Sequence, residues 1–454
     1  MKQSVFAQTF MHLWLPVVLI IFLFAGCASY QAKPLAHSVD LAPTVDQLTS
    51  PMVNPTDGLS LVDVANLAVL NNPDLKAQRK RLGVAQVQLY AAGLLPDPQL
   101  SANLDFPTGS VPGVVNAFGV GLGYDIIPLI NRGARIDSGQ HALQQTNLEL
   151  LWQEWQVSQQ ARSLAVRLSS QRQQIDLLRE MHDLYLQRYR LSINALAKGD
   201  LTLDVTGTDL TALLDILSQI NQLEQTDNDT SHALNGLLGL APESPLQINL
   251  PPIPALPEPQ ALRREINGLP QRRPDLLALQ AGYRSQEAKV RAAILSQFPS
   301  ISIGISRARD TGSLYTNGFN IGLNLPLFSG NRGAIAIERA TREQLREEYQ
   351  ARLDQAAVDV DKLIRLQGIV AAQQQQLDEY LPALEKLVDR GRGPFRRGDI
   401  DALTFLNMET TWIKKRQEKI SLDQIQRENL IALQTVLAMP GDNQPEYVDA
   451  TGGD

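Results

Sequence analysis

The sequence predicts a mainly α-helical protein with a smaller β portion, built from one unit that occurs twice. Three observations predict this fold class. Several motifs recur in the same order about two hundred residues apart. Long stretches without proline carry apolar residues at helical spacing. Four short segments alternate between apolar and polar residues with a period of two, which is typical of strands that are apolar on one side only.

The duplication is visible in four pairs of motifs. They are Asn72-Pro73-Asp74-Leu75 with Arg273-Pro274-Asp275-Leu276, Leu95-Pro96 with Phe298-Pro299, Asn131-Arg132-Gly133 with Asn331-Arg332-Gly333, and Lys198-Gly199-Asp200-Leu201 with Arg397-Gly398-Asp399-Ile400. Because an internal repeat fixes the architecture, we expect each copy to contain a helix, two strands, a long helix, a tip and a second helix.

The helical segments are unusually long. A helix over about residues 133–197 would measure about 96 Å, and such a helix is stable only when it packs along its length against others. One face of each long helix is rich in Gln and Arg, including Gln153, Gln159, Gln171, Gln173, Gln174 and Gln373 to Gln376. Two interpretations remain: a solvated helix face, or a face that lines a water-filled interior.

Four segments are predicted as strands: residues 99–106, 118–126, 300–306 and 319–327. Their polar faces are small or uncharged, and the segments approach the 9–11 residues with which a tilted strand crosses a bilayer. Four strands cannot close a barrel, and an open edge in hydrocarbon would leave backbone groups unpaired. Several chains must then share one barrel. Two chains would give a filled eight-stranded barrel, and three would give twelve strands and a pore.

Composition excludes several classes of function. A net charge of −7 gives no basic surface for nucleic acid. One cysteine permits neither an intrachain disulfide nor a thiolate cluster, and five scattered histidines do not suggest a metal site. No grouping of nucleophile, base and metal ligand indicates an enzyme, and no glycine-rich phosphate loop could hold ATP. We therefore expect no catalytic, metal-binding or cofactor-binding site.

Residues 1–26 resemble a bacterial signal peptide, with Lys2 before an apolar run that is short for a membrane span. The run ends Ala25-Gly26-Cys27, which resembles a lipobox, although Phe24 stands where Leu is preferred. An ordinary signal peptide with an incidental cysteine is the alternative. We favour a lipoprotein whose mature N-terminus is Cys27 with acyl chains such as palmitate. Ala28, in place of an Asp that would resemble an inner-membrane retention signal, indicates the outer membrane.

After the leader, the chain resembles the TolC-like outer membrane efflux protein family (the outer membrane factors), in the duplicated order of its motifs. The resemblance implies a homotrimer in the outer membrane of a Gram-negative bacterium. It implies a 12-stranded transmembrane β-barrel, four strands from each chain, and a long α-helical barrel in the periplasm. It also implies a passive duct that docks to a periplasmic adaptor protein and an inner-membrane pump of the RND or ABC type. No cofactor is expected beyond the covalent lipid on Cys27.

Two segments resemble the heavy-metal efflux branch of the family, so we expect efflux of heavy metals or drugs. They are Leu94-Leu95-Pro96-Asp97-Pro98 and Pro326-Leu327-Phe328-Ser329-Gly330-Asn331-Arg332-Gly333. The expected organisation is a signal peptide (1–26), a lipidated leader (27–58), a first efflux repeat (59–240), an extended proline-rich connector (241–270), a second efflux repeat (271–439) and an irregular tail (440–454).

The resemblance places a constriction at the periplasmic helix tips. Candidate gate or tip residues are Arg396, Arg397, Gly398, Asp399, Asp401 and Asn407, and candidate adaptor-docking residues of the first repeat are Lys198, Gly199 and Asp200. A ring of ion pairs or hydrogen bonds there could hold a shut state. We favour the simpler interpretation that Gly199 and Gly398 end helices and that Asp200 and Asp399 cap the next ones. Ile400, Thr404 and Asn407 depart from the best-known gate pattern, which favours a less charged constriction.

A second function class remains open, namely a lipid-tethered periplasmic adaptor or scaffold with helical hairpins. Such an adaptor would show one hairpin, not two duplicated helix pairs, and no alternating segments of bilayer length. The four alternating segments therefore favour the channel.

Overall fold

The computed structural model of the chain describes residues 30–49, 58–108, 112–397 and 399–439. Two compact units are present, Met1–Leu41 and Ala42–Asp454. The described residues of the first unit, 30–41, form neither helix nor strand. Cys27, the predicted site of lipid attachment, and Gly398 lie outside the described residues.

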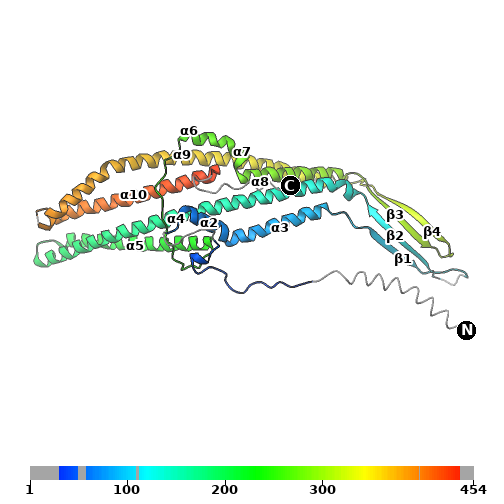
Figure 1. Cartoon of the computed structure of the whole chain (residues 1–454), viewed down its shortest axis with the longest axis horizontal. Helices are drawn as coiled ribbons and strands as arrows, with labels where there is room; N and C mark the ends of the chain where they lie inside the picture. Colours follow the sequence, from blue (N-terminus) through cyan, green and yellow to red (C-terminus); the bar gives the residue numbers. More distant parts are fainter. Residues whose placement is uncertain (1–29, 50–57, 109–111, 398, 440–454) are drawn as a thin grey trace. The chain divides into compact units, whose positions relative to one another are not determined.

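The second unit contains the duplicated order of elements that the motifs predict (Figure 1). Its first half holds η1 (Val45–Gln47), α2 (Leu61–Asn71), α3 (Pro73–Gly93), β1 (Gln99–Asp105), β2 (Ala117–Asp125), α4 (Ile127–Lys198) and α5 (Leu203–Leu238). Its second half holds α6 (Pro259–Glu265), η3 (Ile266–Gly268), α7 (Leu269–Arg272), α8 (Pro274–Leu295), β3 (Ser300–Arg309), β4 (Tyr315–Asn324), α9 (Arg332–Arg397) and α10 (Ala402–Leu437). The predicted fold class is confirmed.

Local chemistry sets the helix starts. Ser60 begins α2 with a capping box, since its hydroxyl accepts from the Asp63 amide while Asp63 accepts from the Ser60 amide. Asn72 caps α3 before Pro73, and Pro274 occupies the same first-turn position of α8, where a missing N–H does no harm. The two motif positions also play one role in both copies. Asn72 donates to the Leu237 carbonyl and Arg273 donates to the Val436 carbonyl, so each holds the end of the returning helix.

The long helices form a single curved wall (Figure 1). Towards the tips the order is α5, α4, α10, α9, and towards the sheet it is α3, α4, α8, α9. Four buried clusters hold the described part of the wall together, and the smallest lies between α9 and α10 around Leu377. One lies among α2, α4 and α5 and includes Leu67, Leu168 and Leu234. Another lies among α8, α9 and α10 around Leu276, and the third joins the two halves through Ile413 of α10, Met181 of α4 and Ile216 of α5.

A cation over an aromatic ring adds a polar link between the halves. The Arg273 guanidinium lies 4.8 Å from the centre of the Trp152 ring on α4. The same guanidinium pairs with Asp275 at 2.7 Å, and both side chains are nearly buried. The recurring Pro-Asp-Leu motif of the second copy is therefore part of the joint between the two repeats.

The four strands form one antiparallel sheet in the order β1-β2-β3-β4, with the two hairpins joined by the pairing of β2 with β3. The strand bounds differ from those predicted. β3 continues to Arg309 because Arg307 and Arg309 keep the alternation, and β4 spans Tyr315–Asn324 rather than 319–327. Pro326, which lacks an N–H to donate to a ladder, explains why the strand ends before it.

One expectation needs correction. The connector over 241–270 is not extended throughout, because α6, η3 and α7 lie within or across its second part. The Gln-rich faces are mixed. Gln173, Gln373, Gln375 and Gln376 are exposed in the single chain, so both interpretations stay open for these residues. Gln159 and Gln171 are buried, and Gln174 donates to Ser421 on α10. Gln374 donates to Asp423 and Gln426 across the α9–α10 contact. Amide side chains here join neighbouring helices.

Among the described helices, none combines the length and apolar character that a transmembrane helix requires.

The ends of α5 and α10 differ in one respect that can be tested. Gly239 ends α5 with φ 73°, whereas Ala438 ends α10 with φ 47°, a left-handed conformation that is unfavourable for a residue with a Cβ atom. We expect Ala438→Gly to stabilise the last turn of α10 by about 1 kcal/mol and to slow its amide hydrogen exchange about fivefold. Ala432→Gly, in the interior of the same helix, should act in the opposite direction. Faster exchange in the Ala438 variant would contradict this account.

Candidate functional site: an apolar sheet face and two helical tips

One face of the sheet is apolar and exposed. Register places Leu100, Leu122, Ile305 and Phe319 in one row across the four strands. Ile303 and Ile321 continue this face towards the helices, as do Ile301 and Leu323. All of these side chains are exposed in the single chain: Leu100, Leu122, Ile301, Ile303, Ile305, Phe319, Ile321 and Leu323. An exposed apolar surface of this extent indicates a lipid or protein partner.

The opposite face of the sheet is polar and carries small residues. Its rows combine Gly, Ser and Asn, as in Ser101–Gly121–Ser306–Gly318. A Cβ on Gly121 would lie 2.8 Å from the Ser101 hydroxyl, and one on Gly318 would lie 2.7 Å from the Ser306 hydroxyl. Glycine therefore leaves room for the serine side chains, and a shallow, mostly polar groove runs along this face.

Both edges of the sheet are unpaired within the described chain. β1 pairs only with β2, and β4 pairs only with β3. The ten-residue β4 thus presents a row of backbone groups without a strand beside it. An isolated chain would expose this edge to solvent or lipid.

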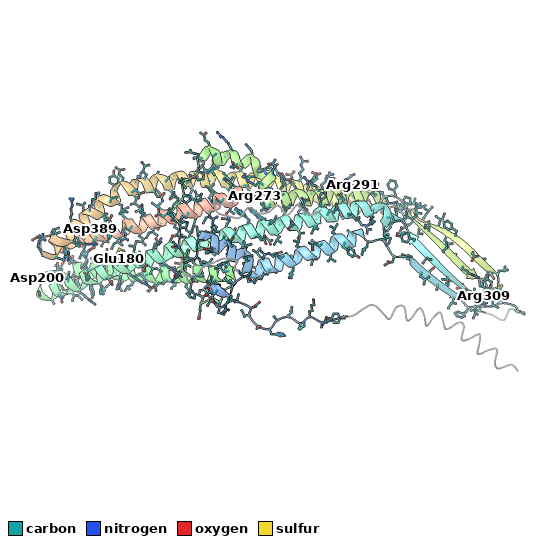
Figure 2. The ribbon with its side chains drawn as sticks, viewed as in Figure 1. Glu180, Asp200, Arg273, Arg291, Arg309 and Asp389 are labelled. Atoms are coloured by element: carbon teal, nitrogen blue, oxygen red, sulfur yellow. The ribbon has the colours of Figure 1, made fainter. Side chains whose placement is uncertain are left out.

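The two tips lie together at the end of the wall farthest from the sheet, where Figure 2 places Asp200 and Asp389, with Arg309 at the opposite end. At the first tip, residues 198–202, Lys198 is the last residue of α4 and Gly199 ends the helix with φ 79°. The capping role predicted for Gly199 is correct, but Asp200 does not cap the next helix. Thr202 takes the N-cap position of α5, and a hydrogen bond from its side chain lowers the pKa of Asp204.

At the second tip, residues 397–401, the prediction for Asp399 is also wrong. Asp401 is the N-cap of α10 and accepts from the Thr404 amide, whereas Asp399 pairs with Arg397 at 2.9 Å. Arg396 donates to the Arg392 carbonyl within α9. Both partners of the Arg397–Asp399 pair are largely exposed, so the pair contributes little to stability.

A more buried ion pair lies about three turns from the tips, and the sequence did not reveal it. The Arg188 guanidinium on α4 lies 2.6 Å from an Asp209 oxygen on α5, and the side chains are only 17% and 4% exposed. Arg188 also donates to the Asn407 side chain on α10 at 3.0 Å. One arginine therefore links three neighbouring helices. Asn407, one of the predicted gate residues, is one of its two partners.

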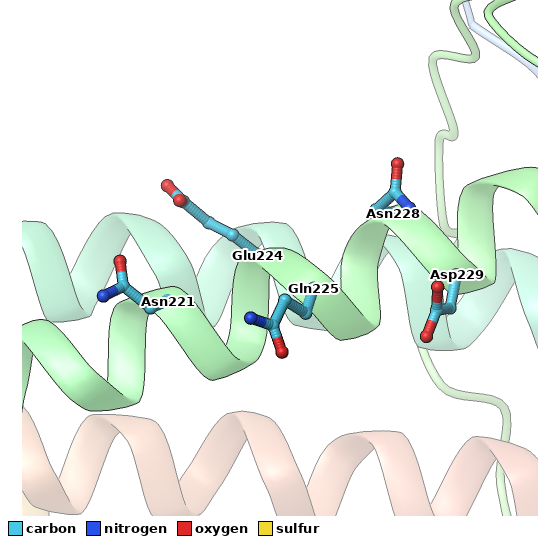
Figure 3. A pocket seen from close by; sticks show the side chains of 5 residues that line it. All are labelled: Asn221, Glu224, Gln225, Asn228 and Asp229. Carbon is cyan, nitrogen blue, oxygen red and sulfur yellow. The ribbon is translucent and has the colours of Figure 1, made fainter.

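A shallow polar groove lies further along α5, lined by Asn221, Glu224, Gln225, Asn228 and Asp229 (Figure 3). Glu224 is paired with Arg179 of α4 at 2.9 Å. Figure 3 shows the groove residues on the surface of α5, with α10 running nearby. Within the described residues, no group of His, Cys, Asp and Glu side chains is arranged to hold a metal ion.

Residues 266–439 match the outer membrane efflux protein family. This match confirms the resemblance inferred from the duplicated motifs and the expected outer-membrane location. It agrees with the prediction that the protein is not an enzyme.

Two curated relatives match part of the chain. The probable outer membrane lipoprotein SilC of Salmonella typhimurium is 25% identical over 36% of this chain and 38% of its own length. The cation efflux system protein CusC of Escherichia coli K12 is 25% identical over 49% of this chain and 50% of its own length. The chain thus spans half the length of these relatives or less. A solved structure of CusC is 19% identical and superposes with a TM-score of 0.66 over 91% of this chain and 99% of its own, which establishes the shared fold.

The Arg188–Asp209 pair can be tested by substitution. Removing one charge from a buried pair leaves the other charge buried without a partner, so we expect Asp209→Asn to destabilise the tip end by about 2 kcal/mol. Amide hydrogen exchange around Asp209 on α5 should then become tenfold faster or more.

Asp176→Asn is a matched control, since Asp176 is 75% exposed and lies 3.7 Å from Arg179. It should change exchange very little, because exposed ion pairs contribute about 0–1 kcal/mol. Equal effects of the two substitutions would mean that the Arg188 contact does not hold the helices together.

Proposed function

We propose that this chain is one third of a trimeric outer-membrane channel, through which cargo passes passively from the periplasm to the exterior. The observation that carries the proposal is the pair of unpaired lateral margins. β1, α3 and α5 form one margin and β4 and α9 form the other, each with neighbours on one side only. A unit with two different open sides closes by head-to-tail association into a ring.

Apolar stripes on the margin helices support the same association. Leu203, Leu210, Leu214 and Leu217 recur on α5 at steps that return to one helix face, and all are exposed in the single chain. Val358, Ile369, Tyr380 and Leu387 do the same along α9. Stripes of this kind bury well against the margin of a second copy, much as apolar seams pack in coiled coils.

The sheet supports the number three. Four strands from each chain give eight in a dimer, a barrel whose interior is filled by side chains, and twelve in a trimer. The glycine-rich polar face, which in this proposal lines the pore, has the small side chains that an open lumen needs. The apolar face then contacts the lipid, while α4, about 108 Å long, extends into the periplasm.

The partners follow from the same proposal. A passive duct needs an energised inner-membrane pump, of the RND or ABC type, and a periplasmic adaptor that docks at Lys198, Gly199 and Asp200 and at the second tip. Similarity to a cation efflux protein supports heavy metals as cargo, with drugs as the other class. The sensitivity of a gene-deletion strain to metal salts, dyes and antibiotics decides between them. The adaptor or scaffold alternative is disfavoured by the four-stranded sheet with its exposed apolar face.

We also propose that Cys27 carries acyl chains that tether the mature N-terminus to the outer membrane. Labelling with radioactive palmitate tests this directly. Label that persists in a Cys27→Ser variant would overturn it.

The shut state, in this proposal, depends on the Arg188 contacts more than on the exposed tips. Arg396, Arg397, Asp399 and Asp401 form short-range contacts within the second tip, which leaves them suited to meeting a partner. Asn407 instead links α10 to α4 through Arg188. Separating these helices would open the tip end, so an adaptor that competes for Arg188 or Asn407 would favour the open state.

Adjacent residues of β4 test the membrane placement. Ile321→Lys would put a charge on the lipid side, which destabilises a membrane barrel by about 2–4 kcal/mol near the bilayer midplane. We therefore expect heat-modifiable trimers to be lost from outer-membrane fractions. Asn320→Lys places the same charge on the pore side, so trimers should persist and conduct in planar bilayers with a changed ion preference. Equal assembly of the Ile321 variant would sink the proposal.

Single-channel recording tests the shut state. Asn407→Ala removes one acceptor of the Arg188 guanidinium, so the open fraction in planar bilayers should rise about fivefold. Thr411→Ala is the control, because the Thr411 hydroxyl bonds only the Asn407 carbonyl of its own helix. An unchanged open fraction in the Asn407 variant, with trimers intact, would show that the constriction lies elsewhere.

A further inference from the structure

The apolar face of the sheet changes chemistry at its end farthest from the helices. Arg307 and Arg309 keep the alternation of Ile301, Ile303 and Ile305, so they lie on the same face as these isoleucines. Register puts Arg307 in the row after Ile305, beside Val120 and Asn317, and puts Arg309 in the next row between Phe118 and Tyr315. We call Arg307, Arg309, Phe118 and Tyr315 the distal rim.

The two arginines rest on the two aromatic rings. The Arg309 guanidinium lies 5.3 Å from the centre of the Phe118 ring, and that of Arg307 lies 5.9 Å from the centre of the Tyr315 ring. The rings themselves meet edge to face at 6.3 Å. Stacking fixes the plane of a guanidinium and leaves its N–H edges available to an outside acceptor.

The positive charge of the rim is not neutralised within the described chain. Neither arginine has an ion pair there, and Arg309 donates only to the Asn116 carbonyl at 2.8 Å, while its Nε is buried without a partner. The nearby carboxylates are committed elsewhere. Asp310 accepts from the amides of Gly312 and Leu314 in its own turn, and Asp105 lies on the opposite face, where it accepts from Asn103.

The distance from the helices matches one apolar thickness. From Phe298, an exposed aromatic residue just before β3, to Arg307 an extended chain runs about 30 Å. A strand tilt of 35–45° reduces this to about 21–25 Å, close to the 25 Å of an apolar barrel band. An unpaired arginine is strongly unfavourable at the bilayer centre but is tolerated near the interface. Arg307 and Arg309 therefore belong at the outer interface, where lipid head groups lie.

We propose that the distal rim binds the phosphate-bearing head group of an outer-leaflet lipid, with Arg307 and Arg309 as the phosphate ligands. This inference rests on the proposed placement of the sheet in the outer membrane. Arginine N–H groups match phosphate oxygens in pairs, and the neighbouring Phe118 and Tyr315 rings pack against the glycerol or sugar above the acyl chains. Each trimer would hold three such lipids around its outer edge.

Lipid retention tests the proposal. Trimers are reconstituted into phosphatidylcholine nanodiscs with diphosphorylated lipid A, and retained lipid A is counted by native mass spectrometry. In the Arg307→Gln, Arg309→Gln double variant, retention should fall about tenfold or more. An Arg264→Gln, Arg346→Gln double variant loses the same charge from exposed helix positions and should retain lipid A as the wild type does.

Three outcomes would overturn the inference. They are equal retention in the rim variant and the wild type, equal retention of dephosphorylated lipid A, and displacement of lipid A by an equal concentration of inorganic phosphate. Conductance is recorded on the same preparations. Normal conductance with unchanged lipid retention would overturn the distal-rim inference alone, whereas wild-type protein that neither forms trimers nor conducts would overturn the proposed function.

Discussion

The unpaired backbone at the two edges of the sheet is the constraint on which the rest of the structure depends. Water can satisfy these groups in a soluble protein, but hydrocarbon cannot, and each unpaired group there costs several kcal/mol. β1 has seven residues and β4 has ten, so the two edges together could outweigh the 5–15 kcal/mol by which a folded domain is typically stable. In the proposed membrane placement, association of several chains therefore follows from the sheet.

The helices extend the same constraint along the wall. Helices in proteins are stabilised mainly by packing against other elements. The 72-residue helix α4 therefore packs along its length on α3, α8, α5 and α10. Polar side chains fix the positions of these helices more specifically than leucines alone can. Arg188 joins three helices near the tips, and Asn72 and Arg273 hold the ends of the returning helices in the two copies. The duplicated unit thus repeats its joints as well as its elements.

The sequence predicts local features of this fold well and distant contacts poorly. Alternation over 99–106 and 300–306 identifies the strands because the period of two depends only on neighbouring residues. The same alternation continues through Arg307 and Arg309, but a strand predicted from apolar residues stops where the charge begins. Arg188 and Asp209 are 21 residues apart and resemble ordinary surface charges in sequence. Their pairing appears only when α4 and α5 turn back on each other. Helix caps are also hard to assign from sequence, since Asp401 rather than Asp399 is the N-cap of α10.

The distal rim marks the end of the apolar face of the sheet. A strand that faces lipid must stay apolar only across the thickness of the hydrocarbon. In β3 the residues on the apolar face change from isoleucine to arginine after Ile305, while the alternation continues. The change occurs where the aromatic Phe118 and Tyr315 stand in neighbouring strands, as aromatic residues do at both interfaces of membrane barrels. Near the other end of the sheet, exposed Phe298 lies between α8 and β3, and exposed Leu327 and Phe328 lie between β4 and α9. The spacing between these two boundaries is a property of the strands themselves, so in the proposed placement the depth of the sheet in the membrane is encoded within each chain.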